Sequence, residues 1–490
     1  MNAKNLNSKI ILGLKLRQLR MEKGLSFSAL SKESGLSLSY LNEIEKGKKY
    51  PKAEKIEKLS ESLGISVEKL TSPELEGSLA PVSNLLKSNF LNELPLDLFG
   101  IEVTKIVEII SQAPKRVGAF ISTLVEIARN HAYVEENFYL GALRSYLEMH
   151  FNYFEDIELV VSQYRIENNI GEIQALTADR LADLLERLYN YDIDKGGLDL
   201  YPELKNIRSL YIPKSKTLLL NGSMTSNQLA FQFGKELGFN YLKLKERANT
   251  SSLLKIRSFE EVLSHFKAAY FSAALLLPLN PVQSRLERFF AKKVFDKEEI
   301  LGLINDYGAS PEMVFQRMTN ILPSKMGIRS IYFFRFMSQE GSINYKVDKE
   351  LHLDGNHHPH SNKMDEIYCR RWLSIRLMEQ IKKNGSKTEI EAQISQYYGT
   401  DDEYLILSHV RRDHQEGTKT VGLSLGILLD KNNRKKIGFL EDPSLGKRIV
   451  NTTCERCPME DCKERIAPPV KYQQRQENKR IDKVLETLLK

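Results

Sequence analysis

Residues 25–51 read LSFSALSKESGLSLSYLNEIEKGKKYP, and their serines and glycines predict how the N-terminal part of the chain folds. Ser26 and Ser37 are residue types that cap helix N-termini, so we expect one helix to begin after each of them. Gly35 permits a tight turn between these two helices, and Gly47 closes the second helix. The stretch therefore predicts two short crossing helices joined by a tight turn.

Apolar residues at helical spacing extend this unit over residues 9–70 and supply its core. The core is predicted to contain Ile10, Leu14, Leu16, Leu19, Leu30, Leu36, Leu41, Ile44, Ile56, Leu59, Leu63, Ile65, Val67 and Leu70. The polar face of the helix at 37–45 stays free, so it can enter a DNA major groove with its first residues nearest the bases.

The residues of that face suggest specific DNA contacts. We expect Ser37, Leu38, Ser39 and Asn42 to face the groove, with Asn42 as the best reader of a base edge. Phosphate contacts are expected from Arg17, Lys46, Lys48 and Lys49.

Charge supports a polyanion as the partner of this module alone. Residues 1–70 carry fourteen Lys and Arg against eight Glu, a net charge of +6, whereas the whole chain has a formal net charge of +7. The remaining residues are therefore almost neutral.

The same residues resemble the XRE-like (Cro/repressor-type) helix-turn-helix family over about sixty positions, from Leu25 to Pro51 and into the flanking helices. The resemblance implies a double-stranded DNA operator. One such module reads few base pairs, so a homodimer on a two-fold operator is expected. Phe27 departs from the family, which often has a Gln there that contacts DNA. A helical module that binds protein instead of DNA is the alternative.

Length and composition limit the class of protein. At about 150 residues per domain, 490 residues suggest roughly three domains, and 41% hydrophobic residues suffice for several cores. The longest apolar run, residues 268–279, is too short to span a bilayer, and the start of the chain lacks a signal peptide's features. Four cysteines do not make a disulfide scaffold. We expect a cytoplasmic protein without a membrane partner.

Two strings in the middle of the chain, residues 227–241 and 270–278, resemble the ImmA/IrrE-type zincin-like domain. Active relatives carry H-E-x-x-H on the first helix, in which two His bind zinc and the Glu activates water. Here the corresponding residues include Lys235, Glu236 and Phe239, and the third ligand position falls near His265 or Lys267. We therefore predict no metal at this site and no enzyme activity. The alternative is a metal-dependent peptidase that acts on a repressor or antitoxin.

Cysteines near the C-terminus suggest a second kind of site. Cys454, Cys457 and Cys462 form C-x2-C-x4-C, a spacing that can hold one tetrahedral ion, and Cys369 is the candidate for the fourth ligand. The competing ligands are His352, His357, His358 and His360. Structural zinc is expected, and reduced thiols, a redox switch or an iron–sulfur site remain open.

The combination of these three parts resembles the short-chain fatty acyl regulator family. That resemblance implies a transcriptional regulator with a small-molecule effector, such as an acyl-CoA, bound in the non-catalytic C-terminal region. The sequence contains no Gly-rich loop typical of phosphate binding that would support CoA directly. An interaction scaffold without sequence preference on DNA is a further alternative.

The expected fold is multidomain, mainly α with α+β parts. We predict a helix-turn-helix bundle at 1–70, a linker at 71–84, a helical domain that could dimerise at 85–198, a degenerate peptidase-like α+β domain at 199–325, a strand-richer α+β domain with the cysteines at 326–470, and a helix at 471–490. Individual helices are expected at 226–247, 259–277 and 479–489, and strands at 209–212, 217–220, 329–337, 342–347, 404–411 and 420–429.

Overall fold

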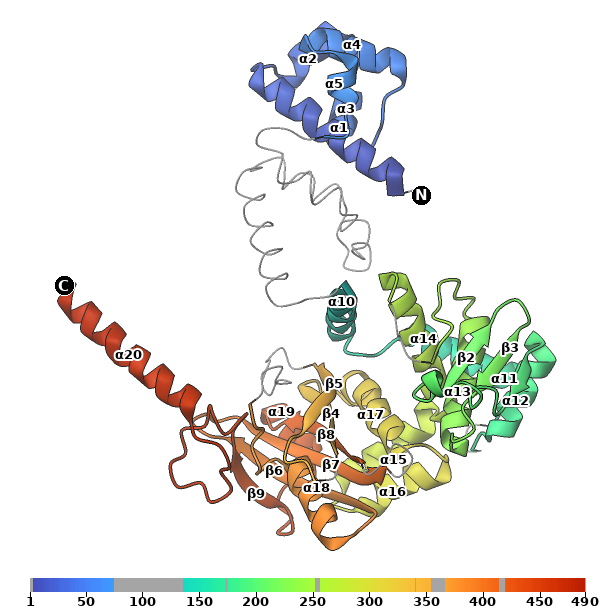
Figure 1. The fold of residues 1–490 in the computed structure, drawn as a ribbon, viewed down its shortest axis with the longest axis vertical. Helices are drawn as coiled ribbons and strands as arrows, with labels where there is room; N and C mark the ends of the chain where they lie inside the picture. The colour runs from blue at the N-terminus through green and yellow to red at the C-terminus, as the bar shows by residue number, and fades with distance from the viewer. Residues whose placement is uncertain are drawn as a thin grey trace. The chain divides into compact units, whose positions relative to one another are not determined.

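The computed structural model describes residues 3–74, 135–171, 175–251, 256–339, 341–353, 366–413 and 419–489 (Figure 1). The chain forms two compact units, one of residues 1–146 with 255–262 and the other of residues 147–254 with 263–490. Most of the predicted linker at 71–84, the predicted helices at 85–134 and the histidines at 357–360 lie outside the described residues.

The N-terminal unit begins with a bundle of five helices: α1 (Ala3–Glu22), α2 (Phe27–Ser34), α3 (Leu38–Glu45), α4 (Ala53–Leu63) and α5 (Val67–Thr71). Both predicted serine caps are confirmed. The Ser26 hydroxyl accepts a hydrogen bond from the amide of Ala29 at 3.1 Å, and the Ser37 hydroxyl accepts one from the amide of Tyr40 at 3.3 Å. Gly35 follows α2 with a φ of 65°, the left-handed conformation that favours glycine.

The core of the bundle holds α3 in a fixed place. It is formed by buried Leu12, Leu16, Leu30, Leu36, Leu41, Ile44, Ile56, Leu59, Leu63 and Leu70. Val67, predicted to belong to this core, is 36% exposed instead, because it begins the short helix α5 at the surface of the bundle. Gly13 lets α1 approach the end of α3, because a Cβ at this position would lie 2.4 Å from the carbonyl oxygen of Ile44. Arg20 on α1 binds both carboxylate oxygens of Glu45 on α3, at 2.6 and 3.0 Å.

The helix α10 (Glu135–Met149) belongs partly to each unit, as does the first turn of α14 (Phe259–Leu276), and the second unit continues with a small α+β region. This region contains α11 (Glu155–Glu167), α12 (Ala178–Tyr189), β1 (Asp192–Asp194), the 3-10 helix η3 (Pro202–Leu204), β2 (Ser209–Ile212), β3 (Thr217–Leu220), α13 (Ser226–Tyr241) and α14. The strands form a sheet in the order β1-β3-β2, and α12 packs against α13.

A six-stranded sheet dominates the rest of the second unit, after α15 (Leu279–Ala291), α16 (Lys297–Asp306) and α17 (Pro311–Lys325). Its strands are β4 (Ile331–Gln339), β5 (Lys346–His352), β6 (Thr388–Tyr397), β7 (Glu403–Asp413), β8 (Lys419–Leu428) and β9 (Gly446–Val450), in the order β5-β4-β8-β7-β6-β9. Neighbouring strands are antiparallel except β6 and β9, which are parallel. The helix α18 (Leu373–Asn384) packs on one face of this sheet through buried apolar side chains.

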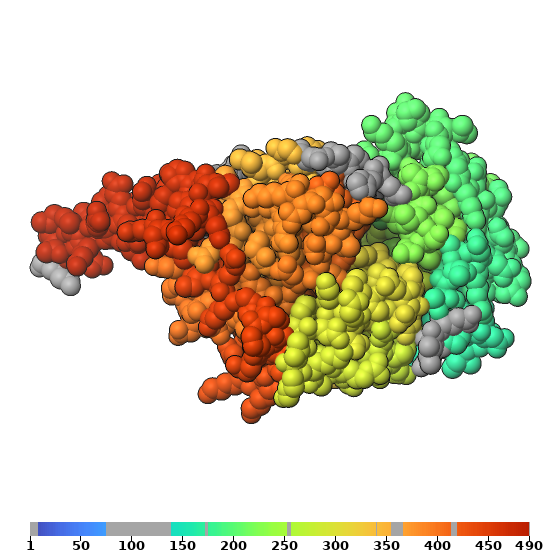
Figure 2. Space-filling view, turned by 90° about the horizontal axis from the view of Figure 1, so that it is seen from below, coloured from blue at the N-terminus to red at the C-terminus, as the bar shows by residue number. Residues whose placement is uncertain are grey.

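Two further helices complete the chain, α19 (Lys431–Lys436) and α20 (Val470–Leu488). No residue of α20 is buried, and the helix stands out from the body of its unit in Figures 1 and 2. Figure 2 also shows the helical residues around 280–325, in yellow, packed directly against the strand-rich part in orange.

The structure corrects several predicted boundaries. The C-terminal helix begins at Val470, as expected for the segment at 471–490 but earlier than the amphipathic stretch at 479–489 indicated. The helix α13 ends at Tyr241 instead of residue 247, and β5 begins at Lys346 instead of residue 342. The helix α18 and the strands β6 and β9 were not predicted from the sequence. In the part of the chain that the structure describes, no single helix is long and apolar enough to cross a membrane; α14 and α15 pass such a test only as a pair, bent by 71°.

Candidate nucleic-acid interface

The exposed face of α3 carries the residues predicted to enter the groove. Leu38 is 49% exposed, and Ser39, Asn42 and Lys46 are exposed as well. Leu38, Asn42 and Lys46 follow one another at intervals of four residues, so they lie along one side of the helix. Ser37 is exposed beside them, with its hydroxyl already engaged as the cap of α3.

The residues predicted to contact phosphates surround this face unevenly. Lys48 is exposed, and Lys49 forms an ion pair with Glu43 at 2.8 Å, which raises the pKa of the lysine. Arg17 on α1 is half-buried, and its Nε has no hydrogen-bond partner among the residues that the structure describes. Contact of Arg17, Lys46, Lys48 or Lys49 with phosphate stays a prediction.

Phe27 is accounted for by the packing of the bundle. Its half-buried ring packs against the apolar core, and the guanidinium carbon of Arg20 lies 4.2 Å from the ring centroid. The same Arg20 holds Glu45, so this phenylalanine supports the contact between α1 and α3. Ser28, the next residue of the first turn of α2, is exposed.

Sequence reasoning missed a basic cluster beside α3. The Nζ of Lys55 on α4 lies 4.0 Å from the ring centroid of Tyr40, and the Nζ of Lys49 lies 5.7 Å from it. Lys52, at the N-terminus of α4, is exposed. No local pattern pairs these lysines with a tyrosine of another helix, so only the folded bundle shows the cluster.

Lys235 and His265, singled out as positions that carry zinc ligands in active peptidases, lie side by side. The Nζ of Lys235 lies 2.8 Å from Nε2 of His265 and donates to the carbonyl oxygen of Ser251 at 3.1 Å. Burial lowers the pKa of Lys235 to about 7, although Glu236 opposes this shift, and burial lowers the pKa of His265 as well. Lys267 is half-buried, and no contact of it with this pair is seen.

Glu236, the residue that matches the catalytic Glu of active relatives, is saturated by protein donors. Its carboxylate accepts hydrogen bonds from Arg247 at 2.8 and 3.1 Å, from the Tyr191 hydroxyl at 3.0 Å and from Gln232 at 3.2 Å. The guanidinium of Arg247 lies 4.1 Å from the ring centroid of Phe239. A carboxylate held in this way is an ion-pair partner and is poorly placed to take a proton from water.

Three of the four cysteines come close together. Cys369, Cys454 and Cys457 are buried and Cys462 is half-buried. Burial, with the Cys454 and Cys457 thiols nearby, raises the pKa of Cys369 to about 11. A bridge between residues 368 and 453 brings the two segments together. Among the described residues, however, no three His, Cys, Asp or Glu side chains are placed to hold a metal ion. The thiols as they lie do not form a metal site, and structural zinc stays a prediction.

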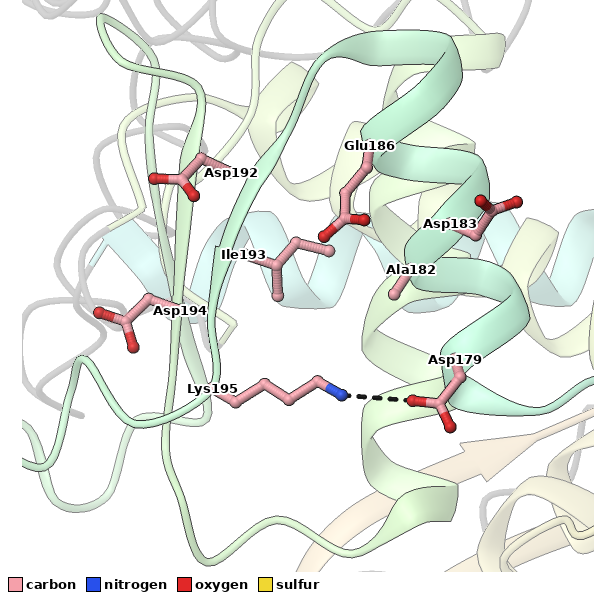
Figure 3. Close-up of a pocket in the computed structure, with 8 residues that line it drawn as sticks. All are labelled: Asp179, Ala182, Asp183, Glu186, Asp192, Ile193, Asp194 and Lys195. Carbon is pink, nitrogen blue, oxygen red and sulfur yellow. Dashed lines mark hydrogen bonds and ion pairs between the residues drawn. The ribbon is translucent and has the colours of Figure 1, made fainter.

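A hollow of about 600 Å³ lies between α12 and β1, lined by Asp179, Ala182, Asp183, Glu186, Asp192, Ile193, Asp194 and Lys195. Figure 3 shows the Lys195 side chain reaching across it to Asp179, an ion pair of 3.2 Å. The residues that line this hollow carry five carboxylates and one lysine, which is already paired with Asp179, so its net charge disfavours an anionic ligand such as an acyl-CoA.

Comparisons with known proteins agree with the geometry of the bundle. Residues 16–70 match the family model described as "Helix-turn-helix". A Bacillus subtilis protein, "Uncharacterized HTH-type transcriptional regulator YazB", is 38% identical over 64 residues, which cover 13% of this chain and 93% of that protein.

Other relatives match far more of the chain. The "Propionyl-CoA carboxylase regulator" of Cereibacter sphaeroides is 22% identical over 356 residues, covering 68% of this chain and 70% of that protein. The "HTH-type transcriptional regulator RamB" of Mycobacterium tuberculosis is 22% identical over 490 residues, covering 94% and 95%. A solved structure titled "Mycobacterium tuberculosis transcriptional regulator" is 18% identical with a TM-score of 0.47 and covers 66% of this chain and 92% of that one, a value too low to establish a common fold.

The structure and the comparisons both point to the N-terminal bundle as the DNA-binding part of the chain. In this bundle Ser37 caps α3, and the exposed face of α3 is mostly polar. The N-terminal domain belongs to the XRE-type helix-turn-helix family, and the chain is a DNA-binding transcriptional regulator.

Proposed function

We propose that this regulator acts as a homodimer on a two-fold operator, and that a small acyl-CoA-like metabolite changes its affinity for that operator. The observation that carries the DNA-reading half is the exposed side of α3, where Leu38, Asn42 and Lys46 follow one another. A single helix of eight residues reaches few base pairs, and two copies related by a two-fold axis double the site.

The effector half rests on the extent of the similarity to known regulators. The alignment with a propionyl-CoA carboxylase regulator covers 68% of this chain, well beyond residues 16–70 that match the helix-turn-helix model. The two proteins are therefore similar in the residues that follow the helix-turn-helix domain as well as in that domain. This similarity supports the proposal that both sense a metabolite in the same way. The acidic hollow between α12 and β1 is a poor site for the negatively charged CoA, so we place the effector elsewhere in residues 135–489.

The peptidase alternative receives no support from the geometry. Glu236 is held by Arg247, and the position of the first zinc ligand is taken by Lys235, whose Nζ lies 2.8 Å from Nε2 of His265. The Nζ of Lys235 is engaged with His265 and the carbonyl oxygen of Ser251, and its charged form repels a divalent cation.

The DNA-reading half is tested by selecting genomic fragments that the purified full-length protein binds at physiological salt. We expect a palindromic motif with the native chain and its loss with the Ser39→Ala/Asn42→Ala variant. Val67→Ala, an exposed apolar change on α5, is the matched control and should recover the same motif. Uniform, salt-sensitive binding by all three proteins would contradict sequence reading by α3.

The effector half is tested on the selected operator by fluorescence anisotropy with propionyl-CoA, acetyl-CoA, free CoA and propionate. A coupling of 1 to 3 kcal/mol is usual for allosteric ligands, which means a change of about 5- to 150-fold in the operator dissociation constant. Unchanged affinity with every one of these compounds would contradict the effector proposal and leave DNA reading intact. Sedimentation equilibrium, with and without operator, tests the homodimer.

A further inference from the structure

One apolar side chain interrupts the polar reading face of α3. Leu38 is the first residue of the helix, directly after the capping residue Ser37, and it is 49% exposed. Leu41 and Ile44 are buried in the core of the bundle, whereas Leu38 is not part of that core. The bundle therefore does not need Leu38 for its packing, and its side chain is displayed at the end of the helix that enters a groove first.

The neighbours of Leu38 define what it can meet there. Asn42 lies one turn further along the same side, and an Asn of this kind pairs with the N6 and N7 atoms of adenine. Glu43, the residue after Asn42, is paired with Lys49 at 2.8 Å, so its charge is compensated beside a phosphate backbone. Leu38 is thus an apolar group beside an adenine reader on a face whose charge suits DNA.

The major groove offers one matching apolar group, the C5-methyl of thymine. Contact between the leucine and this methyl removes apolar surface of both groups from water, which is favourable, whereas the donor and acceptor atoms of other base edges would lose hydration against a leucine. We propose that Leu38 is a specificity-determining residue that selects thymine through its methyl group. This inference rests on the proposed reading of an operator by α3.

The test uses the operator obtained by the fragment selection and single replacements of thymidine by deoxyuridine, which removes one methyl and keeps the base pair. Affinities are measured by anisotropy with the full-length native protein, Leu38→Ala and the control Val67→Ala, each checked for an unchanged circular dichroism spectrum and melting temperature. At one thymine of each half-site, loss of the methyl should weaken native binding about fourfold, the effect of one methyl-sized group.

The Leu38→Ala variant decides whether the leucine is responsible. It should bind the thymidine and deoxyuridine operators equally at that position, while Val67→Ala keeps the native fourfold difference. Equal native affinity for thymidine and deoxyuridine at every position would overturn the inference, and the palindromic motif itself would still stand. A methyl effect that Leu38→Ala leaves unchanged would also overturn it, since another residue would then contact the methyl. A selection without any motif would overturn both this inference and operator reading.

Discussion

The buried Lys235 should make the second unit more stable as the pH rises from 7 to 9. Its pKa lies near 7 in the folded protein, mainly because burial disfavours the charged form, against an ordinary value of 10.5 in an unfolded chain. Between these values the unfolded state binds more protons than the folded state. The free energy of unfolding therefore increases with pH in this window, and the dependence on this lysine flattens below pH 7, where both states are charged.

The size of this effect follows from the two pKa values. Linkage gives an increase of about 2 kcal/mol between pH 7 and pH 9 for a single group with this shift. Lys235→Met keeps a side chain of similar length without a titrating group. This variant should lack the increase of the free energy of unfolding with pH. The loss of the contacts with His265 and Ser251 can shift that free energy, but by the same amount at every pH.

The assay is urea denaturation of the full chain at pH 7, 8 and 9, monitored by tryptophan fluorescence. The single tryptophan, Trp372, lies in the same compact unit as Lys235. Lys214→Met, a change of an exposed lysine in that unit, is the matched control and should keep the native pH dependence. Parallel curves for the native protein and Lys235→Met would refute the reasoning, because the buried ammonium would then not be the group that titrates.

Three other predictions concern the helix-turn-helix bundle and the cysteine thiols. Gly13→Ala places a Cβ 2.4 Å from the carbonyl oxygen of Ile44, so we expect overpacking of about 1 to 3 kcal/mol in thermal melts and weaker operator binding. Arg20→Ala leaves the carboxylate of Glu45, which is 4% exposed, without its ion pair, and should destabilise the bundle by about 3 to 5 kcal/mol in the same assay, whereas Arg20→Lys should restore part of this loss. If the predicted zinc binds, elemental analysis should find about one ion per chain in the native protein and none in Cys454→Ser; a metal-free native protein with four reduced thiols would contradict zinc.

Local signals account for what the sequence predicted well. The caps at Ser26 and Ser37 and the turn at Gly35 depend on residues a few positions apart, so their pattern is visible without a fold. The exposure of Asn42 followed from helical periodicity alone.

Contacts between distant segments explain what it missed. Glu236 is paired with Arg247, eleven positions away and beyond the end of α13, and its other partner Tyr191 lies in a different segment. The strand β9 spans only five residues and pairs in parallel with β6, about fifty positions earlier, so neither alternation nor a hairpin turn marks it. Such pairings are set by tertiary packing, which no local pattern encodes.

The contact between α1 and α3, formed at Gly13 and by the ion pair of Arg20 with Glu45, also affects how operator preference can evolve. Positions that anchor the helix are separate from those that face outward, Leu38, Ser39 and Asn42. Substitutions at the outward positions change few internal contacts and cost little stability. A duplicated copy of this gene could therefore acquire a new set of target promoters by a few surface changes, while its folding and the rest of its sequence were inherited unaltered.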